Sequence, residues 1–107
     1  MAIPNLDELG LLHTNICQAL GDPKRIQILY ALYEKPRHVT ALAKELSLPQ
    51  PTVSRHLASL RQRALVLSKR DGPVVVYYLA VPKIIEILDA MRLVLRESLA
   101  HQTRMLT

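Results

Sequence analysis

The chain has 107 residues, a length that suits one domain, and we expect that domain to span residues 1–107. Half of the residues are hydrophobic, glycine is scarce and neither tryptophan nor phenylalanine occurs, which excludes a disordered chain and favours a mainly helical core. The formal net charge is +5, and the single cysteine, Cys17, excludes an intrachain disulfide.

The first part of the chain is predicted to form two amphipathic helices. Apolar residues recur at helical spacing from Leu6 to about Leu20, and Gly21 ends this first helix. Asp22 supplies an N-cap for the next helix, and Pro23 suits its first turn, where a missing N–H leaves no partner unsatisfied. Pro36 ends the second helix. Its expected buried stripe consists of Ile26, Leu29, Tyr30 and Tyr33.

Two further helices follow, separated by a tight connection. Apolar spacing predicts a short helix over residues 39–46, and Pro49 in the segment SLPQP biases the residue before it towards an extended backbone. A fourth helix starts near Gln50, with Pro51 in its first turn. Its apolar stripe consists of Val53, Leu57, Leu60 and Ala64. Its other faces carry Thr52, Ser54, Arg55, His56, Ser59 and Arg63.

Two runs rich in valine, Val66 to Arg70 and Val74 to Leu79, flank the turn sequence DGP and predict a β-hairpin. Pro73 disfavours a tight two-residue loop, so we expect a longer, projecting loop. Pro82 then opens a long final helix that extends to about Arg104.

The final helix is apolar on more than one face, and a domain of this size has too little core to cover all of these residues. They are Ile84, Ile85, Ile87, Leu88, Met91, Leu93, Val94, Leu95 and Leu99. An apolar surface of this extent usually marks an interface, so we predict a homodimer. Charged residues between Glu86 and Arg96 interrupt the segment, which excludes a membrane span. The N-terminus has no secretory pattern, and we expect a cytoplasmic protein without a membrane partner.

The order of elements predicts a mainly α fold with a small β-hairpin, a winged helix-turn-helix (α-α-α-α-β-β-α). An α-helix fits the major groove of B-DNA, which is ~12 Å wide. No acidic residue lies between Glu45 and Asp71, whereas five of the 14 lysines and arginines do. This localised positive charge favours a polyanion, most often nucleic acid.

The residues near the start of the fourth helix would face base edges in this geometry. Glutamine pairs with adenine, arginine with guanine, and serine or threonine with several bases. Lys69 and Arg70, close to the hairpin tip, would reach a phosphate or the minor groove. The predicted DNA-binding residues are Gln50, Thr52, Ser54, Arg55, His56, Ser59, Arg63, Lys69 and Arg70.

Three segments, CQALGDPKRIQILYAL, VTALAKELSLPQPTVSRHLASLRQRALV and SKRDGPVVVYYL, resemble the ArsR/SmtB family of bacterial winged-helix repressors. The resemblance covers residues 17–79. It implies a homodimeric repressor whose first and last helices form the dimer interface and which an inducer releases from double-stranded operator DNA. Two positions depart from the family pattern. Pro49 stands where members often carry a capping serine or threonine, and Gly72-Pro73 stands where the wing tip often reads Gly-Arg.

The resemblance raises the question of a sensed metal, and no cofactor follows from the sequence with certainty. The family's thiolate site has no counterpart, because VTALAKELS contains no cysteine. A second family site on the last helix is broken, since Met91 stands where a histidine is expected. His13 and Cys17 share a helix face, and His101 of a partner's last helix could join them to bind a transition metal. Alternatively, Cys17 is a small core residue or a redox sensor. The inducer could also be a small molecule, or there could be no inducer.

Two other classes of function compete with DNA binding. A protein-interaction module with this fold would expose apolar or aromatic side chains where the basic ones stand. The sequence contains no phosphate-binding glycine loop, no set of nucleophile and base, and no paired carboxylates in an apolar setting, so we do not expect an enzyme. Repression is favoured over activation only by the resemblance.

Overall fold

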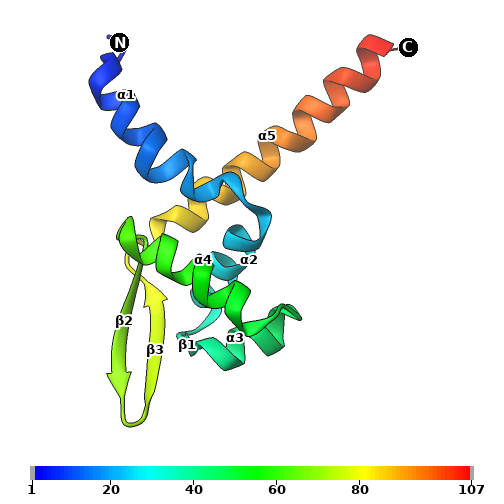
Figure 1. The fold of residues 1–107 in the computed structure, drawn as a ribbon. Coiled ribbons are helices and arrows are strands. Elements are labelled where there is room, and N and C mark those ends of the chain that lie inside the picture. Colours follow the sequence, from blue (N-terminus) through cyan, green and yellow to red (C-terminus); the bar gives the residue numbers. More distant parts are fainter. Residues whose placement is uncertain (1, 107) are drawn as a thin grey trace.

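The computed structural model describes residues 2–106 and contains, within them, five α-helices and three strands (Figure 1). The helices are α1 (Leu6–Leu12), α2 (Pro23–Glu34), α3 (Val39–Leu46), α4 (Gln50–Gln62) and α5 (Lys83–Leu106). The strands are β1 (Arg37–His38), β2 (Val66–Asp71) and β3 (Val74–Leu79). The predicted order of helices, hairpin and final helix is confirmed, and β1 is an addition.

Helices α2, α3 and α4 pack with the hairpin into one core, from which α1 and α5 project as two arms (Figure 1). The largest fully buried side chains are Ile28, Leu29, Leu42, Val53, Leu57, Leu60 and Val66. Tyr33 was expected in the buried stripe of α2 but is 58% exposed. The stripe runs instead through Ile28, Leu29 and Leu32, which leaves Tyr33 at its edge.

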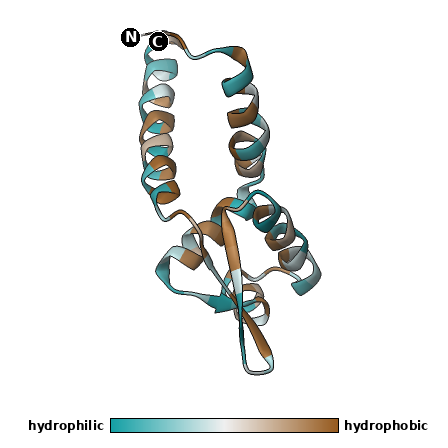
Figure 2. Cartoon of the chain, turned by 90° about the vertical axis from the view of Figure 1, so that its left-hand side faces the viewer, coloured by the Kyte–Doolittle hydropathy of each residue, from teal (hydrophilic) through white to brown (hydrophobic). Residues whose placement is uncertain are grey.

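The two arms expose much apolar surface. No residue of α1 is buried, and α5 buries only Ile84, Ile85 and Leu88 at its start. Hydrophobic residues lie along both arms in Figure 2. The large apolar side chains exposed on α5 are Ile87, Met91, Leu93, Val94, Leu95, Leu99, Met105 and Leu106. Within residues 2–106, none of the helices has the length and apolar character that crossing a membrane requires.

The first helix is not continuous to Leu20, as the spacing had suggested. The α-helix ends at Leu12, a π-turn η1 (His13–Cys17) follows, and a 3₁₀ turn η2 (Ala19–Gly21) completes the segment. Apolar spacing does not distinguish these turns from an α-helix, because the segment stays helical and only its hydrogen-bond pattern changes.

The start of α2 and the start of α4 are capped differently. Asp22 accepts a hydrogen bond from the Lys24 backbone N–H at 2.8 Å through Oδ1, so the predicted N-cap is confirmed. Pro49 provides no side-chain cap for α4, and its carbonyl accepts a hydrogen bond from the Val53 N–H at 3.2 Å.

The hairpin is tighter than expected. Asp71 pairs with Val74, so the loop contains only Gly72 and Pro73. Gly72 adopts a φ of 61°, and the fixed negative φ of proline suits the next position, which is the pattern of a type II′ turn. The third strand, β1, pairs with β3 on the side away from β2, in the order β1-β3-β2.

Candidate nucleic-acid interface

The outward face of α4 carries polar and basic side chains. Gln50, Ser54 and Arg55 are exposed there, as the sequence predicts, and Thr52 is half-buried at the edge of the face. The stripe formed by Val53, Leu57 and Leu60 is buried and attaches the helix to the core. The helix therefore presents its polar face to solvent without losing its packing.

Arg61 is also exposed on α4, although it is not among the DNA-binding residues predicted from the sequence. It is exposed and follows Ser54 by seven residues, which is two helical turns. This spacing was the signal that would have identified it. On the hairpin, Lys69 and Arg70 are both exposed on β2. Four exposed cations thus lie on α4 and β2, with no carboxylate in the chain between Glu45 and Asp71.

His56 does not lie on the outward face, so its prediction as a DNA contact is wrong. It is only 5% exposed, because it follows Val53 by three residues and precedes Leu60 by four, which places it on the buried stripe. Its Nε2 lies 3.7 Å from Asp22 Oδ2 at the start of α2 and has no hydrogen-bond partner among residues 2–106.

Burial lowers the pKa of His56 below its ordinary value. The Asp22 carboxylate opposes this effect, while Arg25, Arg55 and Lys24 reinforce it. Burial therefore favours the neutral imidazole. Asp22 has a lowered pKa as well, mainly because its carboxylate accepts the Lys24 N–H hydrogen bond.

Ser59 and Arg63 also differ from the expectation. Arg63 donates from Nη1 to Ser59 Oγ at 2.8 Å and from Nε to the carbonyl of Thr14 in η1 at 3.3 Å. Both residues are half-buried. The guanidinium of Arg63 is therefore engaged with the segment that follows α1, at the side of α4, rather than free on its outward face.

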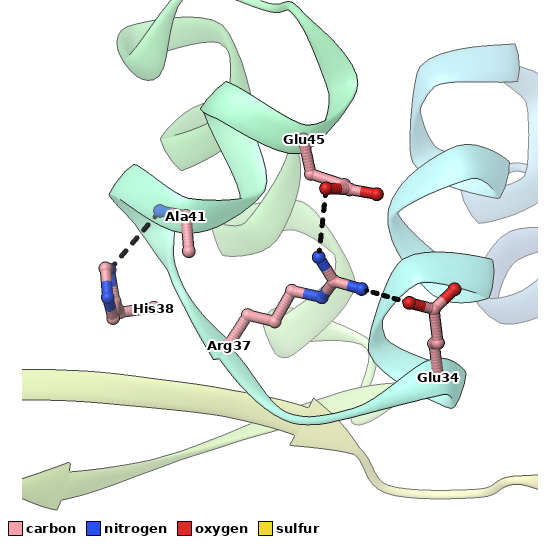
Figure 3. A network of polar contacts seen from close by, with 5 residues as sticks. All are labelled: Glu34, Arg37, His38, Ala41 and Glu45. Atoms are coloured by element: carbon pink, nitrogen blue, oxygen red, sulfur yellow. Dashed lines mark hydrogen bonds and ion pairs between the residues drawn. The ribbon is translucent and has the colours of Figure 1, made fainter.

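The helix that precedes the turn is held by a buried arginine (Figure 3). Arg37 has a side chain that is only 7% exposed, and it contacts Glu34 of α2 at 2.8 Å and Glu45 of α3 at 3.5 Å. His38 caps α3, because its Nδ1 accepts a hydrogen bond from the Ala41 N–H at 3.3 Å. These contacts fix α3 against α2 and so support the position of α4.

The metal-ligand candidates do not assemble in one chain. His13 and Cys17 lie exposed in η1, and His101 lies on the distal part of α5 beside Arg104. Within residues 2–106 no three His, Cys, Asp or Glu residues gather in a geometry suited to a metal ion. In a single chain Cys17 is exposed, so its interpretation as a core residue is wrong.

Comparisons with known proteins identify the family. Residues 22–68 match the profile described as "Bacterial regulatory protein, arsR family". The uncharacterized HTH-type transcriptional regulator Rv0081 of Mycobacterium tuberculosis is 33% identical over 101 residues, which cover 94% of this chain and 89% of that protein. The HTH-type transcriptional regulator KmtR of the same organism is 37% identical over 76 residues, 71% of this chain and 58% of KmtR.

Solved structures agree with this assignment. The crystal structure of Rv0081 has a TM-score of 0.77 and covers 89% of this chain and 96% of its own. A homodimeric winged helix-turn-helix DNA-binding domain from Mycobacterium bovis, Mb0332, is 28% identical with a TM-score of 0.74, covering 94% of this chain and 95% of its own. The chain therefore belongs to the arsR family of bacterial regulatory proteins and is a DNA-binding transcriptional regulator with a winged helix-turn-helix.

Proposed function

We propose that the protein is a homodimeric repressor that binds double-stranded operator DNA through α4 and the hairpin. The observation that carries this proposal is the exposed, carboxylate-free face of α4 with Arg55 and Arg61 on it. A carboxylate on such a surface would repel phosphate, and its absence over the whole segment between Glu45 and Asp71 favours a polyanionic partner.

The outward residues divide into two roles. Gln50, Ser54 and Arg55, near the start of α4, would read base edges, with Thr52 beside them. Arg61, Lys69 and Arg70 would contact phosphates, which fix the position of the protein and supply salt-dependent affinity. We leave His56 out of this set because it is buried, and Ser59 and Arg63 because their side chains bind each other.

The dimer is supported by the exposed apolar residues of α1 and α5 and by the homodimeric state of the Mb0332 domain. Two-fold symmetry would place two copies of α4 about one DNA turn apart, ~34 Å. We expect the protein in the cytoplasm, where operator DNA lies.

An inducer would release the operator, and a transition metal is one candidate. Because His13, Cys17 and His101 do not meet within one chain, a metal site using them requires a second chain to supply a ligand. Native mass spectrometry with a panel of metals, beside a Cys17→Ser variant, tests this: a metal bound by the wild-type dimer and lost by the variant supports the site, and no bound metal contradicts it.

The DNA-binding role is tested by placing a carboxylate on the outward face. Duplexes are first selected from a randomised pool with the wild-type protein, and affinity is then measured at several salt concentrations. Ser54→Glu should abolish measurable binding, whereas Gln27→Glu, which adds the same charge to the exposed surface of α2, should leave it unchanged. Wild-type affinity that does not fall with salt, or a Ser54→Glu variant that binds normally, would contradict the proposal.

A further inference from the structure

The junction between arm α1 and the core is held by two arginines. At the end of η1 the N–H of Gln18, the residue that follows the turn, donates to the His13 carbonyl at 2.9 Å. Arg25 of α2 donates to the carbonyls of Ala19 at 2.6 Å and Gln18 at 2.8 Å. Arg63, at the end of α4, donates to the Thr14 carbonyl at 3.3 Å. The segment between α1 and α2 is therefore fixed by side chains from α2 and from the end of α4. We call α4 the recognition helix, because it carries the proposed base-reading residues.

The guanidinium of Arg63 is itself fixed on α4. Its Nη1 donates to both Oγ and the carbonyl of Ser59, one turn earlier in the helix, at 2.8 and 3.3 Å. The planar guanidinium thus bridges Ser59 on one side and Thr14 on the other. This geometry requires N–H groups that point in different directions, which the guanidinium provides through Nη1 and Nε. Arg63 connects the recognition helix directly to the segment that follows α1.

From this bridge we infer that Arg63, oriented by Ser59, is a positioning residue that fixes the recognition helix relative to the dimer arm and thereby sets the half-site spacing that the dimer reads. The inference rests on the proposed function. Half-sites recognised by two-fold dimers lie about 10 base pairs apart, and both distance and rotation must match. If the orientation of α4 relative to α1 varied, the dimer would lose its preference for one half-site spacing, even if every base contact remained possible.

A direct phosphate contact by Arg63, which the sequence suggested, predicts different behaviour. Arg63→Lys keeps the positive charge but loses the planar fork that reaches two acceptors. Charge-dependent DNA binding survives this substitution, whereas the bridge does not. Ser59→Ala removes the orienting hydroxyl without changing any charge, and Arg96→Lys, made at an exposed arginine of α5 outside the proposed DNA-binding surface, is the matched control.

The first measurement needs neither DNA nor a dimer. Spin labels at Glu8→Cys on α1 and Ala58→Cys on α4, in a Cys17→Ser background and diluted with unlabelled chain, report the distance between the arm and the recognition helix. Arg63→Lys and Ser59→Ala should broaden the distance distribution, and Arg96→Lys should not. Distributions that stay as narrow as the wild type would overturn the inference, and Ser59→Ala decides the matter if Arg63→Lys fails to fold.

The second measurement varies the operator. The half-site selected by the wild-type protein is built into inverted repeats whose spacing is optimal or one or two base pairs longer or shorter. Wild type and Arg96→Lys should prefer the optimal spacing by about tenfold, and Arg63→Lys by less than about threefold, with an unchanged salt slope. An unaltered spacing preference would overturn the inference. A wild-type protein that binds no duplex would instead contradict the proposed function. The inference about Arg63 would then be decided by the spin-label distances between α1 and α4.

Discussion

Arg55 and Lys69 each carry one exposed positive charge, but their positions imply different contributions to DNA binding. Arg55 stands near the start of α4, where its fork suits the N7 and O6 acceptors of guanine, and Lys69 stands on β2. Arg55→Ala should weaken binding to the selected duplex by about 1–3 kcal/mol and relax base preference. Lys69→Ala should weaken all duplexes alike and lower the salt slope by about one.

Fluorescence anisotropy with the selected duplex and a shuffled duplex, over several salt concentrations, separates the two effects. Arg96→Ala on arm α5 serves as the control for loss of charge. If Arg55→Ala lost the same factor on both duplexes, its assignment to base reading would be wrong.

His56 predicts a pH dependence of stability. Its pKa is lowered in the folded protein, so the unfolded chain takes up the proton first as the pH falls. The free energy of unfolding should therefore decrease as the pH drops below about 6.5, the ordinary histidine value, towards the lower folded pKa. Asp22 works in a separate window, because its stabilising contribution is lost only below its ordinary value of 3.8.

Urea unfolding at pH 7.5, 6.5 and 5.5 measures this dependence. His56→Gln should flatten it, whereas His13→Gln, which changes an exposed histidine, should leave it as in the wild type. Equal slopes for His56→Gln and the wild type would show that another group is responsible.

Three residues of the predicted DNA-binding set, His56, Ser59 and Arg63, show where residue chemistry alone misleads. All three are residue types that bind DNA, and they occur in α4 or directly after it. The helical spacing from Val53 and Leu60 already places His56 inward, so this error was avoidable from the sequence. The direction of Arg63 was not predictable, because its partner Thr14 lies in a different part of the chain.

Element boundaries follow the sequence where the signals are local. Asp22 with Pro23 starts α2, and Gly72 forms the turn between β2 and β3. β1 could not be predicted, because a strand of two residues shows no apolar periodicity and forms only through its pairing with β3. The turn η1 is not predicted for a similar reason, since Arg63 holds the carbonyl of Thr14 within it and Arg25 holds the carbonyl of Gln18 directly after it.

A hydrogen bond between α2 and the first turns of α5 helps to hold the arm, and a single substitution can remove it. Tyr30 of α2 donates from its hydroxyl to Asp89 Oδ1 at 2.6 Å, and the Arg92 guanidinium lies 5.5 Å from the centre of the tyrosine ring. Tyr30→Phe keeps the ring and removes the hydroxyl, so it should lower the free energy of unfolding by about 1 kcal/mol.

Urea denaturation checks this value against Tyr33→Phe, which alters an exposed tyrosine of the same helix and should have no effect. A Tyr30→Phe variant as stable as the wild type would show that the Tyr30–Asp89 contact does not hold the arm.

The molecule combines a core whose apolar residues are buried with two arms whose apolar residues are largely exposed. The single chain packs its own core, yet most of the large apolar residues of α1 and of α5 beyond Leu88 are exposed. The sequence predicted this for the last helix from its apolar faces alone, since the domain is too small to cover them. How the arms leave the core was not predictable, because it is fixed by contacts between distant residues such as Tyr30 with Asp89 and Arg63 with Thr14.

Association through the arms should respond to a charge on them. Leu95→Glu places a carboxylate in the exposed apolar surface of α5, far from the core, so it should shift the dimer towards monomer without unfolding the chain. Sedimentation velocity with circular dichroism measures both effects, with Gln27→Glu as the control. A Leu95→Glu variant that remains as dimeric as the wild type would place the interface elsewhere.

The location of the DNA-binding surface is tested most directly by following backbone amide NMR signals while the selected duplex is added. We expect the largest shifts at Gln50, Ser54 and Arg55 on α4, with smaller shifts at Lys69 and Arg70 on the hairpin. Shifts concentrated on α1 and α5, with α4 unaffected, would contradict this expectation.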